Sequence, residues 1–206
     1  MGVLRRIPQE QARHVSRIFL VPKKEAGSYR MVVDLRWVNT HSVRGSAEVE
    51  TLARVSSVVE PNSWMCALDL ADGYYHFRIR PDEQHYFQFE TPDGYFQLEA
   101  LNMGWTLSPG SFCDMLRPLV RELRRQNIRV LWSVADRLMA GATPQEAANA
   151  GDITTKLLDR LGLRIKPEKC QLTPVQRLEH LGLLIDTRSG QFQVGDKKLE
   201  KLRAGA

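Results

Sequence analysis

The stretch RVLWSVADRLMAGAT, residues 129–143, places two short apolar arms on either side of Ser133-Val134-Ala135-Asp136. Short apolar runs that flank a polar turn indicate paired, buried strands. The stretch therefore predicts a tight hairpin with Asp136 as the one acidic residue at its turn. Whether this turn is a working site, a disabled one or neither depends on the segments around it.

Further strands are predicted by apolar alternation between turn residues. The segments 16–24 and 29–39 indicate two strands joined by a turn at Gly27. The segment 85–100 has alternating aromatic residues around Thr91-Pro92-Asp93-Gly94, which is typical of a hairpin. The remaining predicted strands begin at WMCALDL (64–70), at LRIKP (163–167) and in the hairpin LEHLGLLIDTRSGQFQV (178–194), whose turn is expected at 188–190.

Two helices are predicted by apolar residues at three- and four-residue spacing. The first begins at Ser108-Pro109 and runs to about Gln126, with Pro118 expected to kink it. The second has Thr143 as N-cap with a capping box at Glu146, and it stops at Gly162. A final helix begins at 197–206. Strands and helices mixed in this order, without a repeated βαβ unit, predict an α+β fold with a largely antiparallel sheet and helices packed on one face.

The composition is that of an ordinary soluble globular protein. The chain has 206 residues, enough for one domain or two small lobes, with 43% hydrophobic and 26% charged residues. No apolar run reaches the roughly 18 residues of a membrane span, so no membrane partner is expected. Three separated cysteines favour a reducing, intracellular compartment and no zinc site. The Arg-rich start suits either a mature basic arm or an organellar transit segment, so nucleus, cytoplasm and mitochondrion stay open.

The net charge of +5 is unevenly distributed. Residues 1–45 carry nine Lys and Arg against three Asp and Glu, residues 46–115 carry three against eleven, and residues 116–206 carry seventeen against ten. Basic flanks around an acidic middle suit a nucleic-acid protein with a metal-binding centre, because phosphates attract cations and metals attract carboxylates. Solvated charged faces would give the same counts.

Six collinear blocks resemble the successive motifs of a reverse transcriptase. The resemblance is to the retroviral and LTR-retrotransposon branch, or to the tyrosine-recombinase retroelements, and it covers about residues 16–186. It implies RNA-directed DNA polymerase activity with Mg²⁺ as the ancestral cofactor; an unrelated α+β domain is the alternative. The blocks are FLVPKK…YRMVVDLRWVN, LDLADGYYHF, LNMGWTLSPGSF, VLWSVADRLMAG, GLRIKPEKC and EHLGLLID.

The resemblance implies a fingers and palm organisation. It predicts a basic N-terminal arm at 1–15, a fingers-like region at 16–63 and a palm-like region at 64–195, with a fingers hairpin near 85–100. Residues 196–206 would begin a truncated thumb. We expect a polymerase without a thumb to hold primer–template poorly, because much of the affinity comes from phosphate contacts along the duplex.

Asp69 lies in the apolar run CALDL, where a charge is costly unless it is paired or binds metal. The resemblance implies that it is a catalytic carboxylate that holds Mg²⁺ for in-line nucleotidyl transfer. The other interpretation is a strand-end aspartate that caps the backbone. Asp72 is a nucleotide-binding candidate that could equally cap the following turn.

The other nucleotide-binding candidates also follow from the resemblance. Lys23 and Arg30 would clamp the triphosphate, and Tyr74 would exclude a 2′-hydroxyl. Met103 and Gly104 belong to the block that supports the nucleotide, where Gly104 is expected to allow close approach of the backbone. Without the resemblance, these residues would be solvated charges, a core aromatic and a turn.

The turn 133–136 departs from the family pattern of aromatic-x-Asp-Asp. Ala135 stands where the first aspartate shares both metals with Asp69, and Arg137 places a cation beside the metal pocket. Because successive strand side chains alternate, we expect Asp136 to face elsewhere. The metal site, reduced to Asp69 with a vestigial Asp136, is therefore expected to be disabled and to hold no cofactor.

Three functions remain open. The first is a domesticated, inactive domain (a pseudoenzyme) that binds RNA or DNA, or that is a structural subunit of a ribonucleoprotein or protein assembly. The second is an active polymerase with an atypical metal site that borrows Asp136 or Asp72. The third is a decayed retroelement fragment without a selected role. Surfaces once covered by missing domains would be exposed, which favours other protein subunits as partners.

Overall fold

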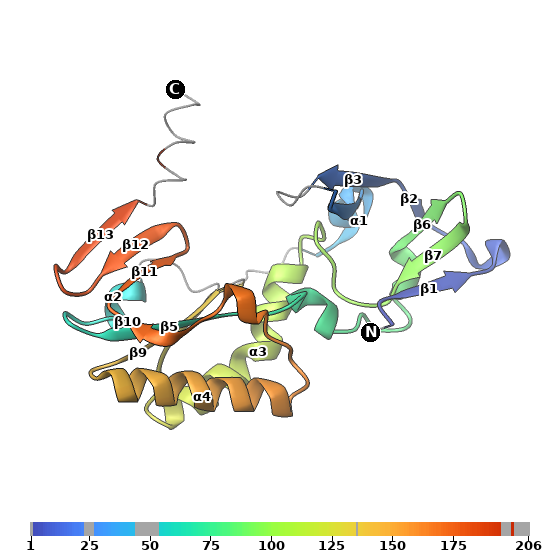
Figure 1. The fold of residues 1–206 in the computed structure, drawn as a ribbon. Coiled ribbons are helices and arrows are strands. Elements are labelled where there is room, and N and C mark those ends of the chain that lie inside the picture. Colours follow the sequence, from blue (N-terminus) through green and yellow to red (C-terminus); the bar gives the residue numbers. More distant parts are fainter. Residues whose placement is uncertain (1, 23–26, 44–53, 135, 195–198, 200–206) are drawn as a thin grey trace. The chain divides into compact units, whose positions relative to one another are not determined.

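The computed structural model describes residues 2–22, 27–43, 54–134, 136–194 and 199. It divides into two compact units (Figure 1). Unit 1 comprises Met1–Ala47 and Tyr74–Phe112, and unit 2 comprises Glu48–Gly73 and Cys113–Ala206. The fingers, palm and thumb boundaries stay a prediction, and most of the segment expected to begin a thumb lies outside the described residues.

Unit 1 is built from two small sheets. The larger has the strand order β1-β7-β6-β2, in which β2 pairs with β6 in parallel and the other pairs are antiparallel. The smaller is the antiparallel pair β3-β4. The elements are β1 (Leu4–Ile7), η1 (Gln9–Gln11), β2 (Val15–Ser16), β3 (Ile18–Pro22), β4 (Tyr29–Val33), α1 (Arg36–His41), η4 (Gln84–Tyr86), β6 (Gln88–Thr91) and β7 (Gly94–Leu98), with the turn η3 (Gly73–His76) at the boundary with unit 2.

The hairpin around Thr91-Pro92-Asp93-Gly94 is confirmed as β6 and β7. The second predicted strand was too long, since β4 ends at Val33 and α1 follows. Asp34 explains the change of direction: its carboxylate accepts hydrogen bonds from the backbone N–H of Arg36 (3.2 Å) and from its Nε (2.8 Å). A side-chain bond to the backbone two residues on makes a turn, and this competes with strand continuation.

Unit 2 is centred on a four-stranded sheet of strand order β10-β5-β9-β8 (Figure 1). Helix α4 packs across β5, β9 and β10, and the sheet β11-β12-β13 lies on the other side of that sheet. Helix α3 belongs to unit 2 from Cys113 onward. The elements are α2 (Val55–Val58), β5 (Trp64–Asp69), α3 (Ser108–Arg125), β8 (Arg129–Trp132), β9 (Asp136–Gly141), α4 (Pro144–Arg160), η5 (Pro167–Lys169), β10 (Gln171–Val175), β11 (Arg177–His180), β12 (Leu183–Asp186) and β13 (Gln191–Val194).

The predicted N-cap of α4 at Thr143 is confirmed, although Glu146 bonds back to the residue before the cap; the kink expected at Pro118 stays a prediction. Thr143 Oγ1 accepts from the N–H of Glu146 (3.1 Å), and Glu146 accepts from the N–H of Ala142 (2.8 Å). Gly162 follows α4 with a φ of +70°, a left-handed conformation that glycine adopts without penalty. Helix α3 continues through Pro118 as one element. None of the helices described here is both long and apolar enough to cross a membrane.

The strand predicted at 163–167 is reduced to one bridge, Leu70–Ile165. Pro167 begins η5 directly afterwards, and proline lacks the N–H that would continue the ladder. The last predicted hairpin contains three strands, with an additional turn at Leu181-Gly182. The α+β class, with largely antiparallel sheets, is confirmed by these elements.

The buried core of unit 2 shows which side chains lie on each face of the sheet β10-β5-β9-β8. Met65, Leu138 and Ala140 pack with residues of α2 and β12. On the other face, Gly151 of α4 lies 3.8 Å from Cys66 when a Cβ is built on it. Side chains alternate along β5 and β9, so every second residue faces α4.

Candidate active site

The hairpin predicted at 129–143 is present as β8 and β9. Ser133 closes its turn: the Ser133 N–H donates to the carbonyl of Asp136 (3.0 Å), and Ser133 Oγ donates to the same carbonyl (2.9 Å). The N–H of Asp136 donates in turn to Ser133 Oγ (3.1 Å). Ser133 is only 3% exposed, so the turn is held by a buried polar clamp. Ala135 lies outside the described residues.

Asp69 and Asp136 lie side by side on the neighbouring strands β5 and β9. They are direct partners in the antiparallel register of β5 and β9. Directly opposed residues place their side chains on the same face, with Cβ atoms about 5 Å apart. The expectation that the Asp136 side chain points away from Asp69 was therefore wrong. That expectation used only the alternation of side chains along the hairpin, whereas the register between β5 and β9 decides which residues share a face.

The pKa of Asp69 is raised, and the first cause is burial. Three cations, Lys169, Arg137 and Lys166, lower it, whereas the carboxylate of Asp136 raises it further. Burial and a like charge both disfavour the ionised form. The site thus brings two carboxylates together among three cations.

Arg137 lies behind this pair of carboxylates. It follows Asp136 in the strand and therefore points to the face that α4 covers. It is fully buried, and its guanidinium carbon lies 4.7 Å from the centroid of the Trp132 ring. Burial lowers the Arg137 pKa to about 10, which leaves it charged at neutral pH. Its positive charge acts on Asp69 and Asp136 through the sheet.

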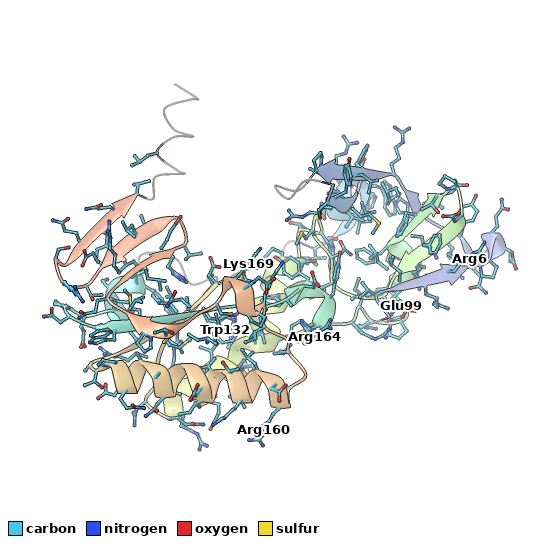
Figure 2. The ribbon with its side chains drawn as sticks, in the orientation of Figure 1. Arg6, Glu99, Trp132, Arg160, Arg164 and Lys169 are labelled. Carbon is cyan, nitrogen blue, oxygen red and sulfur yellow. The ribbon has the colours of Figure 1, made fainter. Side chains whose placement is uncertain are left out.

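The segment after α4 braces Asp69 and brings the lysines to it. The N–H of Lys166 donates to the carbonyl of Asp69 (2.8 Å), and the N–H of Asp69 donates to Cys170 Sγ (3.4 Å). Lys169 lies within this segment, in η5 (Figure 2). Both lysines stand in the block GLRIKPEKC. Sequence reasoning gave them no role, because they lie about a hundred residues from Asp69 along the chain and only the fold brings them close to it.

His180 is a further residue that the sequence did not single out. It ends β11, is 3% exposed, and its pKa is lowered by burial and raised by Asp136. It therefore belongs to the surroundings of the second carboxylate. A single histidine in the apolar stretch EHLGLL carries no signal that would have identified it.

Asp72 occupies the turn after β5. It is exposed and has a φ of +51°, which aspartate tolerates better than most side chains. This conformation favours its interpretation as a turn residue. Its role toward a nucleotide stays a prediction.

Arg30, Tyr74, Met103 and Gly104, the other nucleotide-binding candidates, belong to unit 1. Lys23 lies outside the described residues. Arg30 is exposed on β4. Tyr74 contacts the Phe112 ring edge-on, with centroids 5.3 Å apart, so it also serves the core. Met103 is 46% exposed in the turn before α3. Their binding roles stay predictions.

Gly104 has a φ of +101°, and this conformation, rather than close approach, requires glycine. A Cβ built there would lie 3.6 Å from the carbonyl oxygen of Val33, an ordinary contact. Asn39 holds the loop: its Nδ2 donates to the Gly104 carbonyl (2.8 Å) and its Oδ1 accepts from the Thr106 N–H (2.8 Å).

Comparison with known proteins gives one consistent result. The family described as "Reverse transcriptase (RNA-dependent DNA polymerase)" matches residues 21–185. The Gag-Pol polyprotein of Rous sarcoma virus subgroup B is 31% identical over 168 residues, and that of gibbon ape leukemia virus is 29% identical over 177 residues. These matches cover 76% and 81% of this chain, which spans about a tenth of either polyprotein.

Solved structures agree on the fold. The foamy viral protease-reverse transcriptase in complex with double-stranded DNA superposes with a TM-score of 0.84 at 22% identity, over 98% of this chain and 34% of that one. Its complex with an RNA/DNA hybrid gives a TM-score of 0.77 at 20% identity, over 98% and 26%. With the ordered sequence blocks and the hairpin that faces Asp69, these matches show that the chain belongs to the reverse transcriptase (RNA-dependent DNA polymerase) family.

Proposed function

We propose that this reverse transcriptase domain is catalytically inactive and binds nucleic acid as a subunit of a larger assembly. The observation that carries the proposal is the charge balance around Asp69. Two carboxylates, Asp69 and Asp136, stand among the cations Lys166, Lys169 and Arg137, and Lys166 is also paired with Glu168 (3.6 Å). Ala135 adds no carboxylate where the family pattern has one.

The donor set does not fit a pair of Mg²⁺ ions. Two-metal nucleotidyl transfer needs carboxylates that hold two cations about 4 Å apart. Asp69 and Asp136 would have to do this alone, and the pKa of Asp69 is raised by burial. Arg137 is fixed by burial against Trp132, so its charge cannot move away when a cation approaches.

The same charges favour phosphate. Lys169 and Lys166 act on the charge of Asp69, and Lys166 also pairs with Glu168 (3.6 Å); a nucleic-acid backbone would meet these lysines without a metal ion to mediate the contact. The related foamy viral enzyme has been solved with double-stranded DNA and with an RNA/DNA hybrid, which supports nucleic acid as the ligand.

Association with other subunits is supported by exposed apolar residues in unit 1. Phe19, Leu20 and Val21 of β3 are 50%, 64% and 47% exposed. Because side chains alternate along a strand, Phe19 and Val21 lie on one face of β3 and Leu20 on the other; exposed apolar surface of this kind is typical of interaction sites.

Titration of a labelled RNA/DNA duplex at several salt concentrations, with EDTA present throughout, tests the binding function. We expect binding without metal, with an affinity that falls as salt rises. The double variant Lys166→Gln/Lys169→Gln should bind more weakly and with a shallower salt dependence, by about one phosphate contact per lysine. The matched control is Lys156→Gln/Arg160→Gln on the exposed surface of α4, which should bind as the wild type does. Binding that requires Mg²⁺, or that is equal in both double variants, would contradict the proposal.

One observation favours the alternative, an active RNA-directed DNA polymerase with an atypical site. Asp136 lies opposite Asp69 on one face, so a borrowed carboxylate is geometrically available. Metal-dependent incorporation of dNTPs on a primed RNA template would establish this alternative.

A further inference from the structure

Arg137 is enclosed in an apolar row on one face of the sheet β10-β5-β9-β8. It pairs with Leu68 of β5 and with Trp132 of β8, and directly opposed residues lie on the same face. Leu68 is 2% exposed, Trp132 3% and Arg137 0%. Met139, two residues along β9 on the same face, is also 0% exposed. The interior of unit 2 therefore contains a guanidinium group among apolar side chains.

A charge in this position is costly. Removing an ion from water costs more than a contact with an aromatic ring returns. The Trp132 ring, whose centroid lies 4.7 Å from the guanidinium carbon, therefore does not by itself offset the burial of Arg137. Burial lowers the pKa of Arg137 to about 10, so the side chain still carries its proton at neutral pH. An ionised group in the interior needs an opposite charge within reach.

The opposite charge comes from Asp69 and Asp136. Among the acidic groups that act on Arg137, Asp69 is the strongest, Asp136 follows, and the thiols of Cys113 and Cys170 come after both. Arg137 is the next residue after Asp136 in β9, and Asp136 is the direct partner of Asp69. The two carboxylates and the guanidinium therefore lie at the same end of the sheet, on its two faces.

The lysines near Asp69 differ from Arg137 in their access to water. Burial raises the pKa of Asp69; Lys169 lowers it more than Arg137 does, and Lys166 lowers it less. Lys169 is exposed, and Lys166, which is partly exposed, also pairs with Glu168 (3.6 Å). If Asp69 lost its charge, the two lysines would stay solvated, whereas Arg137 would stay enclosed. The buried guanidinium is therefore the cation that depends on the carboxylates.

We propose that Arg137 is a built-in counter-ion of Asp69 and Asp136, and that its fixed positive charge replaces the charge of bound divalent cations. In a two-metal site, cations compensate the carboxylates that hold them. Here the compensation acts through the sheet and needs no ligand. The two carboxylates then have a structural role, because they balance a charge that the interior of unit 2 encloses. The inference rests on the proposed function in one respect, that Asp69 and Asp136 hold no metal ion.

A double-mutant cycle on the full chain tests the inference, with thermal unfolding followed by circular dichroism in EDTA. Asp69→Asn should lower the unfolding midpoint of the wild type by about 5 °C, because it removes the stronger of the two opposite charges. In an Arg137→Met background, which lacks the buried guanidinium, the same substitution should lower the midpoint by less than about 1 °C. Asp72→Asn, in the exposed turn after β5, is the matched control and should change the midpoint equally in both backgrounds.

Equal shifts by Asp69→Asn in the two backgrounds would overturn the inference. If Arg137→Met does not fold, a shift by Asp69→Asn in the wild type no larger than that of Asp72→Asn would overturn it as well. The wild type should also unfold at the same temperature in MgCl₂ and in EDTA. A midpoint that MgCl₂ raises in the wild type but not in Asp69→Asn would overturn this inference together with the proposed inactivity. Equal shifts in the two backgrounds without any response to MgCl₂ would overturn this inference alone.

Discussion

Replacing Ser133 by alanine should weaken the hairpin that carries Asp136. The serine hydroxyl accepts the N–H of Asp136 (3.1 Å) and donates to its carbonyl (2.9 Å). The carbonyl keeps the N–H of Ser133 as a second donor (3.0 Å), so the substitution deprives chiefly the Asp136 N–H of its partner. An N–H that loses its partner in a buried place costs about 1–3 kcal/mol.

We therefore expect Ser133→Ala to lower the free energy of unfolding by about 2 kcal/mol, which corresponds to a midpoint about 5 °C lower for a chain of this length. Urea unfolding followed by circular dichroism measures the change. Ser189→Ala is the matched control, because Ser189 is exposed in the turn between β12 and β13 and should change stability by less than about 0.5 kcal/mol. If Ser133→Ala lowers the free energy of unfolding no more than Ser189→Ala does, the Ser133 hydroxyl does not stabilise the hairpin and the prediction is refuted.

Further predictions concern packing and titration. Gly141→Ala should destabilise the protein by about 2 kcal/mol, because its Cβ would lie 2.5 Å from a backbone nitrogen at the start of α4. Gly151→Ala inside α4 meets nothing closer than 3.8 Å and should instead stabilise it by about 0.5–1 kcal/mol; thermal unfolding of both variants checks the pair. Burial lowers the His180 pKa, so the unfolded chain binds its proton first and stability should be lost as pH falls below about 6.5, by at most about 1.4 kcal/mol per pH unit. Stability of wild type and His180→Gln that varies identically with pH would contradict this assignment. Burial raises the pKa of Cys66 to about 11, so iodoacetamide at pH 8 should leave Cys66 unmodified until the chain is unfolded, as mass spectrometry of the digested protein would show.

Much of the fold follows from local signals in the sequence. Thr143, Glu146 and Gly162 define α4 because caps act within a few residues of the chain. The hairpin at 91–94 is equally local. The strand predicted through Asn39 failed because a side-chain bond of Asp34 redirects the backbone, and β propensity alone does not encode that bond.

The candidate site was predictable in part. The position of Asp69 and the loss at Ala135 are visible in the ordered sequence blocks. The orientation of Asp136 was not, because it depends on the register between β5 and β9, which are separated by more than sixty residues. Lys166 and Lys169 were missed for the same reason, since only the folded chain brings them to Asp69.

Primer extension on an RNA template with Mg²⁺ tests the central claim most directly, with Asp69→Asn as the inactive baseline and Ala135→Asp beside the wild type. Our account predicts that wild type incorporates no more dNTP than Asp69→Asn does, because one carboxylate of the metal pair is missing. Incorporation by the wild type that requires Mg²⁺ and is lost in Asp69→Asn would contradict it and establish an active polymerase.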